Sequence, residues 1–167
     1  MALVIQGKIT KMGNDVNTDV IIPGKYLDYT ELSDLEKYAF EPLGEDFRKE
    51  LKTSEIIVAG RNFGCGSARE QGATAIKAMG IKAVVARSFA RTFFRNAINS
   101  GLFVVEQPDI YESVESGEEL LVDLDKSIMT SRGKDFKFPP LPEGVSQILR
   151  YGGLFEYMKK EIEAGEI

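Results

Sequence analysis

The sequence predicts an α/β fold with a central parallel β-α-β-α-β unit, followed by small antiparallel strands. Three apolar runs, at residues 55–60, 82–88 and 102–106, have the length and composition of buried strands. A helical pattern of apolar residues lies between consecutive runs, the first from Ala68 to Met79 and the second from Phe89 to Ile98, and Gly80 and Gly101 end these patterns. Such short connections predict parallel strands joined by right-handed crossovers.

The N-terminal third has weaker signals. Residues 2–10 alternate loosely between apolar and polar and predict a strand. Residues 17–24 predict a loop with a strand-like centre. A short helix is expected at residues 33–40, capped by Ser33, and a further helical turn at residues 47–51.

The C-terminal third has a different pattern. Pro139, Pro140 and Pro142 separate its strands from a C-terminal helical region at about 143–162, which Gly152 and Gly153 interrupt. We expect one domain over residues 1–167, because this length supports one substantial core. The expected antiparallel strands are 119–124, 127–130 and 135–138.

Composition narrows the functional classes. A net charge of -5 argues against a broad basic surface for nucleic acid, and no apolar run is long enough to cross a membrane. The N-terminus has no secretory pattern, which predicts a cytoplasmic protein. With no histidine and one cysteine, the chain has no Ser-His-Asp or Cys-His triad, no internal disulfide and no ligand set for zinc or an iron-sulfur cluster.

The glycine-rich turn at residues 62–70 is the strongest functional signal. It lies between a predicted strand and a predicted helix, where free backbone N–H groups and the helix dipole attract an anion. We expect Ser67 to open this helix and Arg69 to place a positive charge beside it. Without a histidine, an ionised Ser67 hydroxyl stabilised by these groups would be a base.

Simpler interpretations of the same turn remain open. Ser67 is also a common helix cap, and the glycines also suit a tight turn without any ligand. Cys65 is more typical of a small buried side chain than of a reactive thiol, and Arg69 and Glu70 also suit a solvated helix pair. Dinucleotide-binding, P-loop and nucleophile-elbow motifs do not match the turn.

Several motifs together resemble one family: the small subunits of 3-isopropylmalate dehydratase and its homoaconitase relatives, equivalent to the swivelling domain of aconitase. The resemblance spans nearly the whole chain. It is carried by Asp15-Val16-Asn17-Thr18-Asp19-Val20-Ile21-Ile22-Pro23, Asn62-Phe63-Gly64-Cys65-Gly66-Ser67-Ala68-Arg69-Glu70, Arg87-Ser88-Phe89-Ala90-Arg91 and Asn96-Ala97-Ile98-Asn99-Ser100-Gly101-Leu102.

This resemblance implies a three-layer β/β/α swivelling domain and a hydro-lyase that moves a hydroxyl group between adjacent carbons of a malate derivative. It implies that Ser67 removes the carbon-bound proton as an alkoxide, and that Arg69 binds a substrate carboxylate and stabilises the alkoxide. Family members often have a second serine where this chain has Ala68, whose backbone N–H would still stabilise an oxyanion. The substrate-binding residues expected are Thr18, Asp19, Gly66, Ala68, Leu27, Asp28 and Tyr29.

The resemblance also implies a partner. In this family the large subunit carries a four-iron four-sulfur cluster, whose open iron acts as a Lewis acid on the hydroxyl and a carboxylate of the substrate. The small subunit should hold no metal or cofactor and should be inactive alone. Its partners are the large subunit and a small alkylmalate substrate, with self-association of the isolated chain as an alternative that the C-terminal helical region suggests.

Substrate choice in this family depends on the loop after the Pro-Gly turn, here Tyr26-Leu27-Asp28-Tyr29-Thr30. Asp28 matches neither the arginine that suits an extra carboxylate nor the apolar residue that suits an isopropyl group. An aspartate would repel a third carboxylate, while Leu27 and Tyr29 suit an apolar pocket. Asp28 also suits a position in solvent or a pair with a lysine.

The leading hypothesis is therefore 3-isopropylmalate dehydratase in leucine biosynthesis, which interconverts 2-isopropylmalate and 3-isopropylmalate through isopropylmaleate. Homoaconitase, citramalate dehydratase and dimethylmalate dehydratase are the alternatives within the family. A non-catalytic module that binds a carboxylate or phosphate at the same turn is the alternative outside it.

Overall fold

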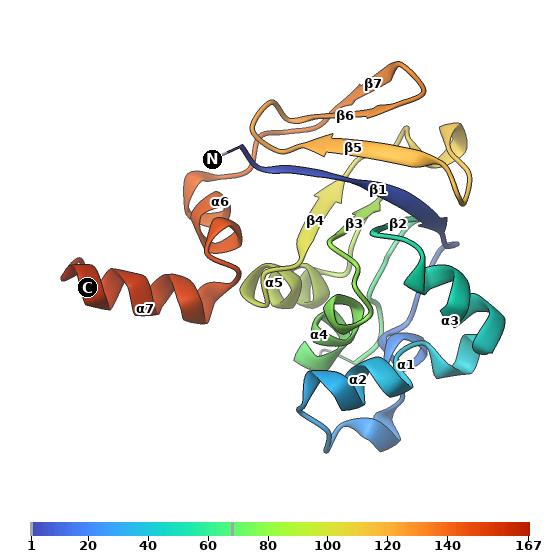
Figure 1. Ribbon diagram of the computed structural model, residues 1–167, viewed down its shortest axis with the longest axis horizontal. Coiled ribbons are helices and arrows are strands. Elements are labelled where there is room, and N and C mark those ends of the chain that lie inside the picture. The colour runs from blue at the N-terminus through green and yellow to red at the C-terminus, as the bar shows by residue number, and fades with distance from the viewer. Residues whose placement is uncertain (1, 68) are drawn as a thin grey trace.

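The computed structural model describes residues 2–67 and 69–167, and within them a seven-stranded sheet has the order β4-β3-β2-β1-β5-β6-β7 (Figure 1). Strands β1 to β4 run parallel to one another, and β5 to β7 follow on the other side of β1, each antiparallel to the strand before it in the sheet. The strands are β1 (Val4–Lys11), β2 (Ile56–Ala59), β3 (Ala83–Ala86), β4 (Phe103–Glu106), β5 (Glu119–Asp123), β6 (Ile128–Ser131) and β7 (Lys134–Lys137).

Helices cover one face of the parallel strands. In Figure 1, α4 and α5 lie on the opposite side of β2, β3 and β4 from β5, and α7 extends away from the rest of the molecule. The α-helices are α1 (Thr18–Ile21), α2 (Leu32–Tyr38), α3 (Glu45–Lys52), α4 (Glu70–Ala78), α5 (Arg91–Asn99), α6 (Glu143–Arg150) and α7 (Leu154–Ala164). Short 3-10 helices span Gly24–Tyr26 (η1), Glu41–Leu43 (η2) and Tyr111–Ser113 (η3).

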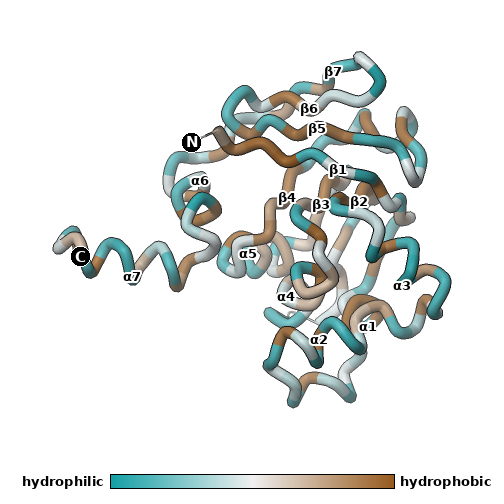
Figure 2. Tube along the Cα trace, in the orientation of Figure 1, coloured by the Kyte–Doolittle hydropathy of each residue, from teal (hydrophilic) through white to brown (hydrophobic). Residues whose placement is uncertain are grey.

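The parallel strands are buried on both faces. Ile57 and Val84 pack into the core beneath α4 and α5, whereas their neighbours Ile56 and Ala83 pack with residues of β5 to β7. This alternation follows from the two-residue period of a strand. Figure 2 shows the hydrophobic residues of β3 and β4 in the middle of the molecule. The sheet therefore curls so that its antiparallel part covers its parallel part, which confirms the expected β/β/α layers.

The carboxyl ends of the parallel strands all lie along one side of the sheet, which we call the carboxyl edge. The segments that continue from β1 and β2 still pair there, through an isolated bridge between Asn17 and Cys65. The segments that follow β2 and β3 do the same through a bridge between Phe63 and Phe89. Ligands in such sheets bind beyond the carboxyl ends of the strands. This edge therefore brings the N-terminal motif and the glycine-rich turn together.

The predicted strands are confirmed to within two residues at each end, and so are their parallel and antiparallel relations. The C-terminal helical region is confirmed as two helices interrupted at Gly152 and Gly153. Residues 47–51 lie within α3, which is longer than the single turn expected.

Three local predictions in the helices were wrong. Residues 18–21 form a helix and not a strand-like loop, because the Asn17 side chain accepts the Asp19 N–H and caps it. Ser33 lies inside α2, whose cap is Glu31. Phe89 was expected in the second crossover helix, but it pairs with Phe63 and the helix begins at Arg91.

Candidate active site

The turn that follows β2 is held by side chains from other segments. Asn62 adopts a left-handed conformation (φ 58). Its backbone N–H donates to Ser88 Oγ at 2.9 Å, and its Nδ2 donates to Asp15 Oδ1 at 2.9 Å. The Gly64 N–H donates to the Val16 carbonyl at 2.8 Å. Asn is among the few residues that adopt this conformation without large strain, and these contacts select it.

Gly64 and Gly66 are required by close approach of other parts of the chain. A Cβ at Gly64 would lie 2.1 Å from Phe93 Cγ, and one at Gly66 would lie 2.5 Å from Asn17 Oδ1. Both residues also have positive φ angles, 81 and 92. Their side-chain space is thus filled by the protein itself, and of the two only Gly66 is exposed.

Ser67 is exposed, but it does not open a helix as predicted. Helix α4 begins at Glu70, and Arg69 is its extended N-cap (φ -113, ψ 130). The Ser67 carbonyl instead accepts the Thr18 hydroxyl at 2.8 Å and the Arg69 N–H at 2.9 Å. These bonds hold Ser67 in a loop one turn before the helix, so the helix cap is excluded as its role.

Helix α1 brings the N-terminal motif to this turn. The Thr18 N–H donates to the Cys65 carbonyl at 2.8 Å, and the Thr18 side chain is 1% exposed. Thr18 is therefore a buried support of the Ser67 backbone. Asp19, the next residue, is exposed and directs its carboxylate to Arg69.

Arg69 connects the two motifs. Its Nη1 lies 2.9 Å from Asp19 Oδ1, and its Nη2 lies 3.4 Å from Ser67 Oγ. The pair with Asp19 replaces the helix pair with Glu70 that the sequence suggested. A guanidinium with one N–H group on a carboxylate and another toward a hydroxyl favours an ionised hydroxyl.

The loop expected to select the substrate begins against this guanidinium. A Cβ at Gly24 would lie 3.3 Å from Arg69 Nη1. Leu27 is half-buried, Asp28 is exposed, and Tyr29 is 39% exposed with its ring 5.4 Å from that of Tyr38. Among the described residues, no hydrogen bond or ion pair joins residues 27–29 to Ser67 or Arg69. Ala68, also expected in the site, lies outside the described residues.

The sequence reasoning missed the supporting residues of the turn. Asn17, Asn62 and Ser88 have defined structural contacts, yet they were noted only as parts of motifs. An Asn followed two residues later by Asp is a helix-cap pattern, and it would have identified Asn17 and α1.

The chemistry of Cys65 does not suit a metal ligand or a nucleophile. Burial and the nearby Asp15 carboxylate raise the pKa of the thiol above its ordinary value. Residues 2–67 and 69–167 contain no group of three His, Cys, Asp or Glu side chains that could hold a metal ion. An iron-sulfur cluster uses several cysteine thiolates, so this chain offers no donor set for one.

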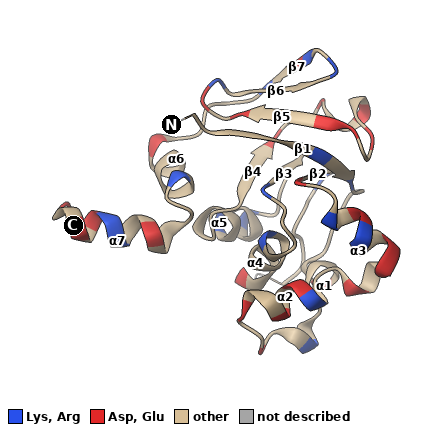
Figure 3. Cartoon of the chain, in the orientation of Figure 1, with Lys and Arg blue, Asp and Glu red and all other residues tan. Residues whose placement is uncertain are grey.

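The helices described here include none with the length and apolar character needed to span a membrane. Acidic and basic side chains are interspersed over α2, α3 and α7 (Figure 3). These helices thus present mixed charge and no broad basic surface.

The fold and the turn define a swivelling domain of the aconitase type. The family model described as the aconitase C-terminal domain matches residues 5–110, which include β1 to β4 and both motifs of the site. Taken with the relatives described next, this match identifies the group more closely: the chain belongs to the family of 3-isopropylmalate dehydratase small subunits.

Curated relatives match over nearly the whole chain. A 3-isopropylmalate dehydratase small subunit from Caldicellulosiruptor saccharolyticus is 44% identical, with 96% of this chain and 94% of the relative covered. The 3-isopropylmalate dehydratase small subunit 1 from Archaeoglobus fulgidus is 48% identical, with 92% of this chain and 96% of the relative covered. The crystal structure of a 3-isopropylmalate dehydratase (LeuD) from Methanocaldococcus jannaschii has a TM-score of 0.88 and 41% identity, covering 99% of this chain and 100% of that one.

Proposed function

We propose that this chain is the small subunit of a cytoplasmic 3-isopropylmalate dehydratase in leucine biosynthesis, and that it acts as one swivelling domain over residues 1–167. The observation that carries the proposal is an exposed Ser67 whose hydroxyl lies 3.4 Å from the Arg69 guanidinium. The names of the relatives at 44% and 48% identity support the reaction.

In this proposal Ser67 is the base that removes the carbon-bound proton of the substrate. A serine hydroxyl is a weak base, so its alkoxide needs nearby positive charge. Arg69 supplies this charge and binds a substrate carboxylate with its remaining N–H groups. The backbone N–H group of Gly66 completes the anion-binding surface in this proposal.

Asp19 is proposed to set the position of Arg69 before the substrate binds. The Arg69 side chain is 23% exposed and already has a carboxylate partner, so part of its charge is neutralised in the free chain. This pairing disfavours the alternative of a stand-alone anion-binding module. The Thr18 hydroxyl donates to the Ser67 carbonyl, and we propose that Thr18 positions Ser67.

The cluster is proposed to reside on a large subunit. It would supply Lewis-acid chemistry at the substrate hydroxyl when bound there. This chain would supply the proton transfer and the carboxylate contact on the opposite side of the substrate. The exposed position of Ser67 is consistent with an active site that closes only when the subunits meet.

The substrate is proposed to be isopropylmalate, with a smaller alkylmalate such as citramalate or dimethylmalate as the alternative. Leu27 and Tyr29 provide apolar surface on the loop that starts against Arg69. Asp28 would repel a third carboxylate, which disfavours homoaconitate.

The test is reconstitution with the cognate large subunit under anaerobic conditions with iron. The wild-type complex should hydrate isopropylmaleate, whereas each subunit alone should be inactive. Ser67→Ala should lower kcat by about 10²–10⁴-fold, the usual contribution of a general base, while the subunits still assemble.

Ser33→Ala is the matched control, because it removes an exposed serine hydroxyl from α2, outside the candidate site. It should leave kcat unchanged. A Ser67→Ala complex with wild-type kcat would exclude Ser67 as the base.

A further inference from the structure

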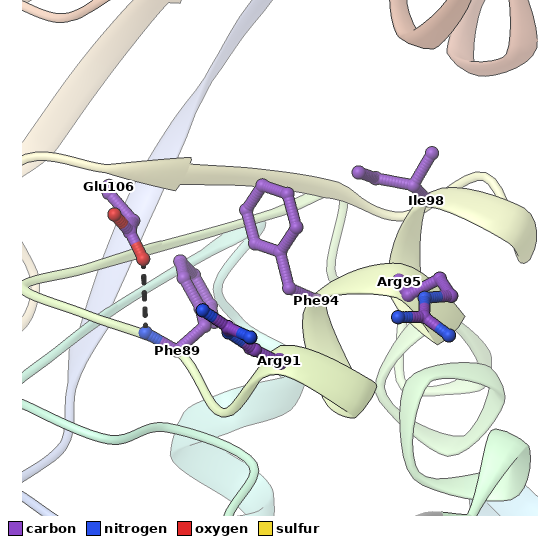
Figure 4. A pocket seen from close by; sticks show the side chains of 6 residues that line it. All are labelled: Phe89, Arg91, Phe94, Arg95, Ile98 and Glu106. Atoms are coloured by element: carbon purple, nitrogen blue, oxygen red, sulfur yellow. Dashed lines mark hydrogen bonds between the residues drawn. The ribbon is translucent and has the colours of Figure 1, made fainter.

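A cleft separate from the Ser67 turn opens at the same edge of the sheet. It has a volume of about 560 Å³, and Figure 4 shows Phe94 between Phe89 and Ile98. Glu106 lies beside Phe89 and accepts the Phe89 N–H at 3.3 Å. The residues that line it are Phe89, Arg91, Phe94, Arg95, Ile98 and Glu106.

The cleft continues into a second hollow. This hollow, of about 190 Å³, shares Phe94 and Glu106 with the first and extends to the proline-rich segment at residues 138–142. Together the two hollows form a groove along β4, which is the edge strand of the parallel part of the sheet. We refer to this combined feature as the β4 groove. Its walls are mostly apolar, and this shape suits a chain segment more than a small acid.

The β4 groove has a positive rim. Arg91 and Arg95 lie one helical turn apart on α5, and no hydrogen bond or ion pair joins either side chain to any other described residue. By contrast, Arg48, Arg69, Arg87 and Arg132 each have a carboxylate partner. Glu106, the one acidic residue among the described residues that line the cleft, accepts the Phe89 N–H. In a chain with a net charge of -5, two guanidinium groups on the rim without an ion pair to a described residue favour a partner that carries carboxylates.

The position of the groove indicates which partner this is. Because Phe89 pairs with Phe63, the segment after β3 lies beside the turn that holds Ser67, and β4 is the next strand beyond β3. Any subunit that brings a cluster to Ser67 must approach this edge. The Phe93 ring, on the same helix as the two arginines, also packs against Gly64 of that turn.

We propose that the β4 groove docks a segment of the large subunit in which acidic side chains flank an apolar or aromatic one. The apolar side chain occupies the cleft beside Phe94, and the carboxylates pair with Arg91 and Arg95. This inference rests on the proposed function, because it requires the large subunit. It adds the surface on which the two chains recognise each other.

The test measures affinity between the full chain and its cognate large subunit by calorimetry. Arg91→Glu/Arg95→Glu should weaken binding by about 30-fold or more, since charge reversal leaves buried carboxylates unpaired and repelled. Wild-type affinity should fall with added salt, and that of the variant should depend on salt much less. Saturating large subunit should restore most of kcat, because neither arginine contacts the substrate.

Lys49→Glu/Lys159→Glu is the matched control, because it makes the same change in net charge at exposed positions on α3 and α7. It should bind the large subunit as wild type does. If the Arg91→Glu/Arg95→Glu variant binds the large subunit with wild-type affinity, the proposed docking surface is wrong. It is also wrong if this variant loses only self-association or only binding of the free substrate.

The two proposals fail in different ways. If the wild-type chain neither binds the large subunit nor gives hydratase activity with it, the proposed function is wrong. If the wild-type complex is active and the double variant assembles equally well, only the docking surface is wrong. Circular dichroism and thermal unfolding of both double variants would show that they are folded.

Discussion

Two neighbouring segments of the site are held in very different ways. The turn at residues 60–69 is tied to Ser88, Asp15 and Val16 by hydrogen bonds of 2.8 to 2.9 Å. The loop at residues 24–30 has local backbone bonds instead, from Leu27 to Gly24 and from Tyr29 to Tyr26. Ring packing adds to these, with Tyr26 stacked on Tyr38 at 4.0 Å.

The tightly held turn contains the proposed catalytic residues, whereas the loop contains the residues proposed to select the substrate. The turn is fixed by contacts from two other segments of the chain, residues 15–16 and Ser88, so its geometry does not depend on the loop at residues 24–30. The loop can change sequence while the turn keeps its geometry. Active sites commonly combine a rigid catalytic frame with variable loops.

The largest effect on stability is expected from Gly64→Ala, which adds a methyl group within the rigid turn. The new methyl group would lie 2.1 Å from Phe93 Cγ at a φ of 81. Overpacking and the left-handed backbone together should lower the free energy of unfolding by about 2–4 kcal/mol, measured by urea denaturation.

Gly72→Ala provides the comparison, because its nearest neighbour would be Thr18 Cγ2 at an ordinary 3.6 Å and it lies within α4. It should be neutral or slightly stabilising, since alanine favours a helix. Equal losses in the two variants would show that the turn is not unusually constrained.

An intermediate effect is expected from Thr18→Val, which keeps the shape but removes the bond to the Ser67 carbonyl at 2.8 Å. Stability should fall by about 1 kcal/mol, and kcat of the reconstituted enzyme by about fivefold, because the Ser67 backbone loses a support. Denaturation and steady-state kinetics would measure the two effects.

Thr53→Val removes a similar hydroxyl bond, to the Glu50 carbonyl at 2.7 Å, but at an exposed position outside the site. Its kcat should equal that of wild type. A fall in kcat as large as that of Thr18→Val would contradict a positioning role for Thr18.

The smallest effect on stability is expected from Asp28→Arg in the loop, within about 0.5 kcal/mol, because the side chain is exposed. The ratio of kcat/KM values should nevertheless shift toward substrates with a third carboxylate, such as homoaconitate. Competition assays with both substrates would measure the shift.

Asp46→Arg on α3 makes the same charge change at another exposed position and should leave selectivity unchanged. An Asp28→Arg variant with unchanged selectivity would remove Asp28 from the substrate pocket. The loop would then differ from the turn in rigidity but not in function.

Sequence patterns predicted the buried strands well because their composition follows from burial on both faces, as Ile56 and Ile57 show. The glycine-rich turn identified Ser67 and Arg69, the family resemblance added Thr18 and Asp19, and the structure places the four together. Their roles in the reaction stay predictions.

The local details were less predictable because they depend on distant residues. Nothing next to Ser67 in the sequence shows that its carbonyl is used by Thr18, which is why the start of α4 was placed too early. Of the two arginines of α5, Arg91 was noted only as the last residue of a family motif, and Arg95 was not singled out. Only the folded chain shows that Arg91 and Arg95 border a cleft.

Strand β1 has a consequence for the synthesis of the chain. It is made before β2 and β5, yet it lies between them, and its pairing runs from Val4 with Asp123 to Lys11 with Val58. During translation one edge of β1 therefore stays open until β5 has left the ribosome. An open, partly apolar edge favours pairing with other chains. The N-terminal strand is thus the segment of this protein most in need of protection while the chain is incomplete.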